Sequence, residues 1–376
     1  MARDDLGCIL VPPCPSYFDQ MQANGRYLTC IGGNCTPVGV VFPIDGEVTA
    51  VTAPDIPVEH WLACQDWVTD IRKIPGWSYV GDIMARLAEL PAAQRKRIGV
   101  TGLKDTTRAP DGTVPPVILD ALRSTYPDAE LVNATPLMDE ARFVKSDEEL
   151  GFIERSIQIV ESAIEVLAAE ARVGVPERVV YGRMYGHMIE QGSDIPTMIL
   201  WSAGWPQLSG NHYMPTSRLL QAGDMLLLEI EARWGGYIGQ VTQPAFLGPI
   251  PQIYEDLWAV QQEAVARCYE VLRPGSTIGD ILTAAAKAGE GTPFECSVIM
   301  HGKGLGDDAP IAIRGTRDER MRSWPIEANS AFMVKPFVQP REGAPPFVYR
   351  GDTVVATPQG ARRLGKRPAE ILQISA

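Results

Sequence analysis

Histidine is scarce in this sequence, and long hydrophobic runs are missing. Four histidines occur among the 376 residues, so a site built from several imidazoles has few residues to draw on. No uninterrupted apolar stretch approaches the roughly 20 residues that cross a lipid bilayer. We therefore expect no membrane-spanning helix, and we expect any imidazole chemistry to rest on one or two positions.

A surplus of basic residues is lacking as well. Lysine and arginine number 34 against 46 acidic residues, which gives a formal net charge of −12. This balance argues against nucleic acid or an anionic membrane as the partner. The seven cysteines include no Cys-x-x-Cys pair, and residues 1–5 begin no apolar leader, so we expect a reduced protein in the cytoplasm.

The composition that remains is typical of a globular protein with two domains. Residues 1–140 alternate short runs rich in β-branched and aromatic residues with helical stretches, which predicts a small α/β domain. Its expected strands are 8–11, 27–31, 38–42, 48–51 and 98–100, and its expected helices are 83–90 and 117–124. Residues 141–376 form the second predicted domain.

Two long helices are predicted in the second domain. Ser146 and Glu149 have the spacing of a capping box, in which each side chain satisfies a free backbone amide at a helix start. A second helix is expected over 253–272, before the helix-ending Pro274-Gly275. In the first helix, apolar residues recur at three- and four-residue steps, at Ile153, Ile157, Val160, Ile164 and Leu167.

One segment of the second domain resembles the central strand pair of the pita-bread enzymes. Residues 223–237 read Gly-Asp-Met-Leu-Leu-Leu-Glu-Ile-Glu-Ala-Arg-Trp-Gly-Gly-Tyr, close to the Gly-Asp-x-x-x-x-Asp-x-Gly-Ala-x-x-x-Gly-Tyr of metallopeptidases in this superfamily. Its members include methionine aminopeptidase, aminopeptidase P, prolidase and creatinase. Residues 24–29 and 145–149 are similar to phrases in creatinase-like relatives. The resemblance implies an α+β fold. A pita-bread domain, an antiparallel sheet flanked by helices with pseudo-twofold symmetry, would follow a smaller creatinase-like α/β domain.

The metal-binding positions of that family hold other residues here. Counted along the family pattern, the two metal aspartates fall on Glu229 and Gln240, and the metal histidine falls on His301. The two metal glutamates fall on Lys335 and Gly351. These side chains cannot bridge a pair of divalent cations, because stable metal sites need three or more suitable ligands. The resemblance therefore implies a metal-free branch, similar to creatinase and ectoine hydrolase, that uses no cofactor.

Two histidines are predicted to act in catalysis. His212 lies where the family places a histidine that contacts substrate and that in creatinase is the proposed proton carrier. Imidazole titrates near neutrality and can take and return a proton within one turnover. A buried structural histidine is the alternative for this position. His301 resembles the creatinase histidine that holds substrate, so we expect it to donate a hydrogen bond to substrate or to anchor substrate in another way.

Glu229 and Lys335 are expected to share one pocket, and two interpretations remain open. The two side chains are either an ion pair that fills the space of two metals, or a general base and an anion clamp. Lys335 and Arg350 would supply the positive charge once provided by metal, so a carboxylate on the substrate is expected. The residues predicted to contact substrate are Gln240, Tyr237, Tyr213, Trp205, Asp308 and Arg350.

Three functions are compatible with this pattern. The first is a metal-independent hydrolase of a C–N bond, in an amide, amidine or related group of a small metabolite. The second is a lyase on the same fold, because removing a proton next to a carboxylate needs the same base and anion clamp. The third is a catalytically silent relative that binds a ligand. The resemblance also implies a homodimer with a shared active-site cleft.

Overall fold

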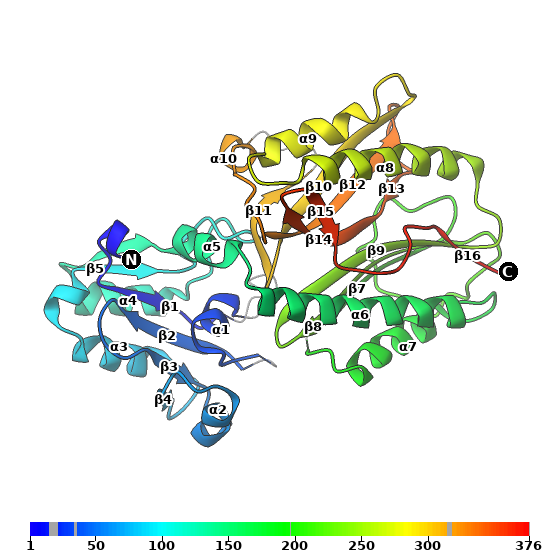
Figure 1. The fold of residues 1–376 in the computed structure, drawn as a ribbon. Coiled ribbons are helices and arrows are strands. Elements are labelled where there is room, and N and C mark those ends of the chain that lie inside the picture. Colours follow the sequence, from blue (N-terminus) through cyan, green and yellow to red (C-terminus); the bar gives the residue numbers. More distant parts are fainter. Residues whose placement is uncertain (15–21, 34–35, 196, 314–317, 376) are drawn as a thin grey trace. The chain divides into compact units, whose positions relative to one another are not determined.

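The structure is a computed structural model that describes residues 1–14, 22–33, 36–195, 197–313 and 318–375. The chain folds into two compact units, which are coloured along the sequence in Figure 1. The first unit comprises Met1–Phe143 together with Leu305–Asp308, and the second comprises Val144–Gly304 together with Ala309–Ala376. In the described part of the chain, no helix is long and apolar enough to cross a membrane.

The first unit is built on a mixed sheet whose described strands lie in the order β4-β3-β2-β1-β5-β6. The pairs β1–β2 and β2–β3 are antiparallel, whereas β3–β4, β1–β5 and β5–β6 are parallel. Its strands are β1 (Cys8–Val11), β2 (Val38–Pro43), β3 (Thr49–Thr52), β4 (Asp70–Lys73), β5 (Arg97–Val100) and β6 (Glu130–Asn133). Its helices are η1 (Ala2–Asp4), α1 (Ala23–Thr29), α2 (Val58–Cys64), α3 (Val80–Glu89), η2 (Ala92–Arg95), α4 (Pro116–Thr125) and α5 (Thr135–Phe143).

β1 lies in the middle of this sheet and is buried on both faces. Leu10 packs on one face with Ile83 of α3, and Ile9 packs on the other face with Trp61 of α2. A strand that is covered on both faces reads as a continuous apolar run rather than as an alternating one. This explains why residues 8–11 contain no polar side chain among the aliphatic ones.

The strand predicted over residues 27–31 is wrong. These residues fall largely in α1, where Thr29 is fully buried and the Tyr27 hydroxyl donates to Ala141 O at 2.8 Å. Cys30 then ends the helix in the left-handed region, with φ of 56°. The run Tyr-Leu-Thr favours strands by composition, but strand preference depends on context and yields to tertiary packing.

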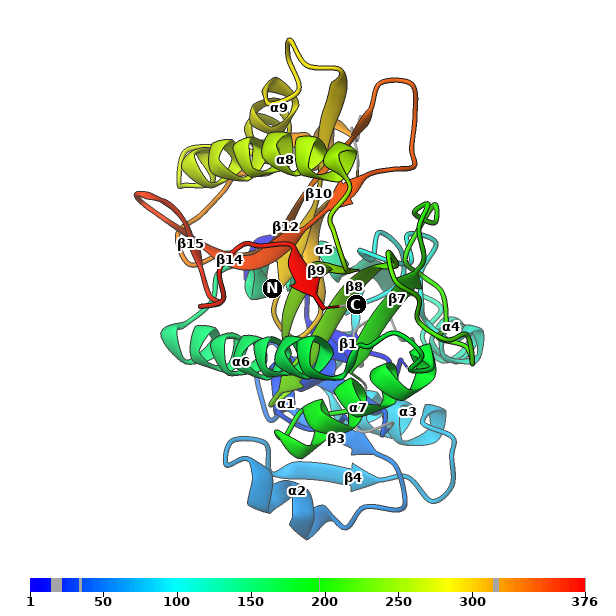
Figure 2. The same cartoon turned by 90° about the vertical axis from the view of Figure 1, so that its right-hand side faces the viewer.

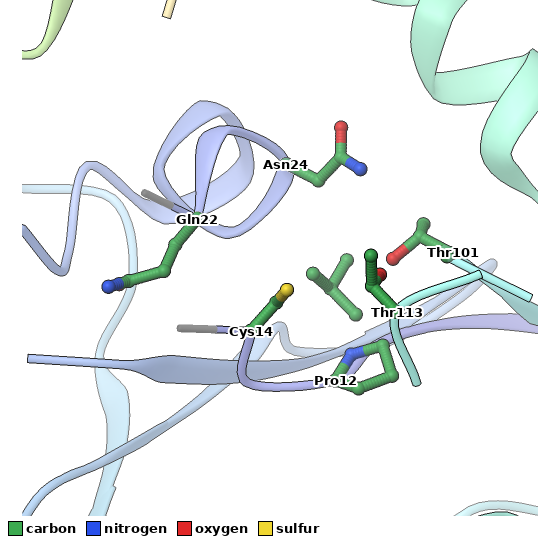
Figure 3. A pocket seen from close by; sticks show the side chains of 8 residues that line it. Pro12, Cys14, Gln22, Asn24, Thr101 and Thr113 are labelled. Atoms are coloured by element: carbon green, nitrogen blue, oxygen red, sulfur yellow. The ribbon is translucent and has the colours of Figure 1, made fainter. Parts of the chain in front are cut away.

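A small cavity in the first unit lies where β1 and β5 end (Figure 3). In Figure 3 the side chains of Thr101, Thr113 and Asn24 gather on one side, whereas the amide of Gln22 is turned away from them. The cavity is lined by Val11, Pro12, Cys14, Gln22, Asn24, Thr101, Gly102 and Thr113. None of the residues that the sequence singles out for chemistry is among them.

The second unit is built on a sheet whose described strands follow the order β11-β10-β12-β14-β9-β8-β7. Three short strands extend it: β13 pairs with β12, β15 with β14, and β16 with β9. Neighbouring strands from β10 to β7 are antiparallel, as the sequence predicts. The strands are β7 (Met198–Ala203), β8 (Met225–Trp234), β9 (Tyr237–Leu247), β10 (Phe294–Lys303), β11 (Asp307–Ala312), β12 (Ala331–Pro340), β13 (Val348–Tyr349), β14 (Gly351–Thr357), β15 (Gly360–Arg363) and β16 (Leu372–Ile374).

Two helix pairs cover this sheet, α6 with α7 and α8 with α9, and they lie over different strands (Figure 2). α6 and α7 pack beside β7, β8 and β9, while α8 and α9 pack beside β10 and β12. This arrangement matches the predicted pseudo-twofold layout of a sheet flanked by helices. The helices are α6 (Asp147–Glu170), α7 (Glu177–Glu190), α8 (Gln252–Val271), α9 (Ile278–Lys287) and α10 (Glu319–Arg322).

α6 begins and packs as its sequence predicts. The Ser146 hydroxyl accepts from Glu149 N at 3.2 Å, and the Glu149 carboxylate accepts from Ser146 N at 2.7 Å, which completes the capping box. The apolar stripe of α6 packs against Leu226, Leu228 and Ile230, which all point to one face of β8. Because side chains alternate along a strand, Glu229 and its neighbours two residues away point to the opposite face.

Candidate active site

The strand register brings Glu229 and Lys335 into one row across the second sheet. Glu229 on β8 pairs with Thr242 on β9, and Thr242 pairs with Gly351 on β14. Val334 on β12 pairs with Asp352, so the next antiparallel position sets Lys335 beside Gly351. Residues directly opposite each other across a ladder share a face, so these four positions form one continuous row.

The adjacent row carries Gln240 and His301. Gln240 pairs with Glu231 on β8, and its backbone is bonded to Thr353 Oγ1 on the other side, at 3.1 Å from N and 2.8 Å from O. Thr353 pairs with Met333, and Met333 pairs with His301 on β10. Two neighbouring rows on one face therefore hold the four predicted residues Glu229, Gln240, His301 and Lys335.

Gly351 makes room for the Lys335 side chain. A Cβ atom built at Gly351 would overlap the Lys335 Cγ and the Val334 carbonyl oxygen. At this position the family pattern has a metal-binding glutamate, and that side chain would occupy the space of the lysine stem. The glycine therefore leaves room for the lysine stem, and the backbone carbonyl of Val334 also excludes a side chain at residue 351.

Replacing Gly351 with alanine should lower the free energy of unfolding by about 1–3 kcal/mol, because an extra methyl group in a close-packed site forces displacement. Urea denaturation measures the change. Gly182→Ala is the matched control, because a Cβ at Gly182 in α7 meets nothing within 4 Å, and alanine favours a helix over glycine. An unchanged unfolding midpoint for Gly351→Ala would contradict the steric match.

Glu229 accepts hydrogen bonds from three donors in a buried ion pair. Lys335 Nζ lies 2.9 Å from Glu229 Oε1, and the two residues are 2% and 4% exposed. Gln240 Nε2 also donates to Oε1, and the Tyr349 hydroxyl donates to Oε2. Lys335 Nζ also lies 5.3 Å from the centre of the Tyr349 ring. A buried carboxylate with this many donors is fixed in position.

The electrostatic balance keeps Glu229 ionised. Burial by itself raises the pKa of this carboxyl, but the charge of Lys335 and the hydrogen bonds from Tyr349 and Lys335 outweigh it. The pKa of Glu229 is therefore lowered from its ordinary value. At neutral pH the group is a stable carboxylate, which makes it a strong acceptor and a weak base.

His301 lies next to the ammonium group of Lys335. Its Nε2 is 3.4 Å from Lys335 Nζ, and its Nδ1 is 3.3 Å from Gly302 O. An ammonium only donates, so Nε2 accepts and the ring proton belongs on Nδ1, which faces a carbonyl oxygen. The Nε2 atom of His301 therefore accepts from Lys335 in this arrangement, and its expected role toward substrate stays a prediction.

A second buried ion pair, which the sequence analysis missed, lies beside the first. Lys303 Nζ is 2.6 Å from Glu231 Oε1, and the residues are 0% and 6% exposed. Glu231 stands two residues after Glu229 on β8, and Lys303 stands two residues after His301 on β10. The two-residue strand period was the available signal, because it places both members of each strand on one face. We call Glu229, Glu231, His301, Lys303 and Lys335 the charge cluster.

Three residues predicted to contact substrate have other partners. The Trp205 ring packs edge-on against Phe246, with centroids 5.6 Å apart, in an apolar core. The Tyr237 hydroxyl donates to Glu149 Oε1 at 3.0 Å, near the start of α6. The Arg350 guanidinium donates to Asp352. Arg350 alternates with Gly351, so it points away from Lys335 and does not add a second cation to the charge cluster.

Asp308 is also committed to an ion pair. Its Oδ1 accepts from Arg142 Nη2, and both residues are buried within the first unit. The adjacent Asp307 pairs with Arg108 in the same unit at 2.8 Å. The carboxylate of Asp308 therefore stabilises the packing of residues 305–308, and it is not one of the groups in the charge cluster.

His212 and Tyr213 are exposed in the segment that precedes β8. Tyr213 N donates to Trp201 O at 3.1 Å, which sets this segment along the outer edge of β7. Within the described residues, the His212 ring makes no hydrogen bond, so it is open to solvent and to a ligand. The end of the segment is held by Arg218, which donates to Asp224 at 2.7 and 2.8 Å.

The donor set at the family's metal positions does not fit a dinuclear centre. Of the five positions, Glu229 alone is a carboxylate, and His301 Nε2 faces the ammonium of Lys335. Across the described residues, no three histidine, cysteine or acidic side chains are grouped as a metal site requires. The Lys335 ammonium supplies one positive charge among these side chains, where the family pattern would have metal.

Comparison with known proteins supports the architecture. An uncharacterised peptidase, YqhT of Bacillus subtilis, is 26% identical over 251 residues, which covers 65% of this chain and 68% of that protein. A creatinase from a Bacillus species is 26% identical over 171 residues, covering 43% and 40% of the two chains. An X-Pro aminopeptidase structure from Thermotoga maritima superimposes with a TM-score of 0.78 at 17% identity, covering 99% of this chain and 97% of that one.

The structural likeness confirms the predicted fold class, an α+β chain with a pita-bread domain and a smaller N-terminal domain. The family model described as metallopeptidase family M24 matches residues 151–358, which is more than half of the chain. Hydrolases, including Xaa-Pro dipeptidases and a creatinase, are found among the relatives. On these grounds the chain belongs to metallopeptidase family M24.

Proposed function

We propose that this protein is a metal-independent hydrolase that cleaves a C–N bond, in an amide, amidine or related group of a small metabolite. The observation that carries the proposal is the ammonium of Lys335, 2.9 Å from Glu229, at positions where the family pattern has two metal-binding carboxylates. One of the relatives by sequence is a creatinase, an enzyme named for a small-molecule substrate. This relative supports a non-peptide substrate for the present protein.

The chemistry needs an activated water, a stabilised oxyanion and a proton for the leaving nitrogen. In this proposal a water oxygen adds to the carbon of the C–N group, and the proton that the water loses passes through His212 to the departing nitrogen. The C–N bond breaks as that nitrogen is protonated. The ammonium of Lys335 is held by Glu229 and His301. It stabilises the negative charge that develops on the carbonyl oxygen of an amide, or on the second nitrogen of an amidine.

The expected carboxylate on the substrate would be held outside the charge cluster. Lys335 is matched by Glu229, and Arg350 is matched by Asp352. A free cation is what a carboxylate clamp requires, and each of these side chains already has a counter-charge at contact distance. These pairs therefore argue against Lys335 or Arg350 as a clamp for a substrate carboxylate, whereas the role of Lys335 toward the developing negative charge is unaffected.

The lyase alternative requires a stronger base than Glu229 provides. Removal of a proton from carbon requires a group poised to accept it, and the lowered pKa and three donors of Glu229 work against that role. A catalytically silent relative would keep the ion pairs but would convert no substrate.

We further propose a cytoplasmic homodimer with a shared active-site cleft, as the resemblance to metal-free relatives implies.

Metal analysis and a turnover screen test the proposal together. Protein purified without added metal should contain well under one equivalent of Mn, Co, Zn or Fe. It should release ammonia or an amine from a panel of small amides and amidines, at a rate that chelator leaves unchanged. Near-stoichiometric metal retained through dialysis against chelator would refute metal independence. An unsaturated product would identify the lyase, and no turnover of any compound would favour the silent relative.

A further inference from the structure

Each lysine of the charge cluster has a carboxylate partner. Lys335 is paired with Glu229 and Lys303 with Glu231, and all four side chains are buried. A charged group arriving from solvent would lose its hydration and find no unmatched counter-charge among these side chains. Moving a charged group from water into this buried site costs much more free energy than moving a neutral polar group.

Two buried oxygen atoms next to the cluster lack hydrogen-bond partners. They are Gln240 Oε1 and Thr242 Oγ1, and their residues are 1% and 0% exposed. Both residues lie on β9, two positions apart, so both side chains point to the face that carries Glu229. An unsatisfied buried polar atom costs about 1–3 kcal/mol, so two on one face mark a place where a partner belongs.

The orientation of the Gln240 amide decides what kind of partner this is. Its Nε2 donates to the Glu229 carboxylate, which only accepts, so Oε1 must be the atom without a partner. An amide oxygen accepts and never donates, and a threonine hydroxyl can also accept. The missing partner is therefore a hydrogen-bond donor.

Charge then narrows the class of donor. A carboxylate has no hydrogen to give and would lie beside the negative charge of Glu229. An ammonium would lie beside Lys335, which already neutralises Glu229 at 2.9 Å. A neutral NH₂ group meets neither objection, because it donates hydrogen bonds without adding charge.

We propose that Gln240 Oε1 and Thr242 Oγ1 form the subsite for a neutral NH₂ group of the substrate, a primary carboxamide or a urea-type nitrogen. The inference rests on the proposed function, because it takes this NH₂ group as the nitrogen side of the C–N bond that is cleaved. Gln240 and Thr242 then determine specificity, by selecting primary amides over the corresponding acids.

Propanamide and propanoate, a pair that differs in the NH₂ group and the charge, are the probes. Saturation-transfer NMR on the full chain should detect binding of propanamide but not of propanoate. Thr242→Val, which keeps the side-chain shape and removes the oxygen, should weaken propanamide binding by about tenfold, the effect of one lost hydrogen bond. Thr242→Ser keeps a hydroxyl and should bind nearly as well as the wild type.

Thr52→Val is the matched control. Thr52 is fully buried in the first unit, and its Oγ1 also lacks a hydrogen-bond partner. Both valine variants should fold and be at least as stable as the wild type, because each removes an unsatisfied hydroxyl. The Thr52→Val variant should leave propanamide binding unchanged.

Three results would overturn the subsite. Propanoate could bind as well as propanamide, Thr242→Val could bind propanamide like the wild type, or no propanamide binding could be detected at the highest soluble concentration. Turnover separates this inference from the proposed function. Amide-selective binding that depends on Thr242 but yields no ammonia would support the subsite and refute the hydrolase.

Discussion

Replacing Lys335 with methionine should lower the free energy of unfolding by about 3–5 kcal/mol, because it leaves the buried Glu229 carboxylate without its cation. The two residues are 2% and 4% exposed, so water cannot take the place of the ammonium at this depth. Urea denaturation with matched spectroscopic probes measures the change. The effect should exceed that of an ordinary surface substitution severalfold.

Two further variants show whether the loss comes from the ion pair. Lys335→Met combined with Glu229→Leu replaces the pair by apolar side chains and should recover most of the stability. Lys104→Met is the surface control, since the Lys104 side chain is 67% exposed, and it should change the free energy by less than about 0.5 kcal/mol. A loss as small as that of the control would rule out a strong buried pair.

The penalty of Lys335→Met should also depend on pH. In the wild type, burial raises the pKa of Glu229. The charge of Lys335 and the hydrogen bond from Tyr349 lower this pKa by more than burial raises it. A carboxyl with a lowered folded-state pKa stabilises the protein above its unfolded pKa, near ~4.3, and this contribution is lost as pH falls through the folded value. In the variant, protonation of Glu229 relieves the unpaired charge. The penalty should therefore be largest at neutral pH and shrink in acid, and equal penalties would contradict the pairing.

Replacing His212 with alanine should reduce turnover by about 10²–10⁴-fold, the usual contribution of a general acid–base group. The melting temperature should stay almost unchanged, because the ring is exposed and makes no hydrogen bond to the described residues. Steady-state kinetics on the best amide from the screen, with a melting curve for each variant, measure both quantities.

His60→Ala is the matched control for this experiment. His60 is an exposed histidine in α2 of the first unit, and the mechanism gives it no role. The control should retain full activity; its melting temperature is measured as well, because the His60 ring contacts Trp61 and Cys64. If His212→Ala turns substrate over at the wild-type rate, the proton must travel by another group, and His212 leaves the mechanism.

Local sequence signals predicted two helices of the second unit, α6 and α8, well. The capping box at Ser146 and Glu149 sets the start of α6, and the second predicted helix, 253–272, differs from α8 (Gln252–Val271) by one residue at each end. Such signals work because capping and the helical period depend on residues only three or four positions apart. The strand expected over 27–31 failed because those few residues are packed as part of α1.

The candidate site was predicted in part. The family pattern pointed to Glu229, Gln240, His301 and Lys335, and the strand register sets them on one face. The pattern did not identify Tyr349 as a donor to Glu229, because Tyr349 is not one of the family's metal positions. It also could not show that Arg350 is held by Asp352, since that depends on which way each side chain leaves its strand.

The sequence alone determined that the family's metal carboxylates are replaced, because the identity of a side chain decides which ions it can bind. The resemblance of residues 223–237 to the family's strand pair also implied the fold class. The tertiary structure alone decided how the other charges are matched: Lys303 with Glu231, and Arg350 with Asp352. Ion pairs between residues far apart in the sequence depend on strand register and burial. A local sequence pattern predicts neither of these.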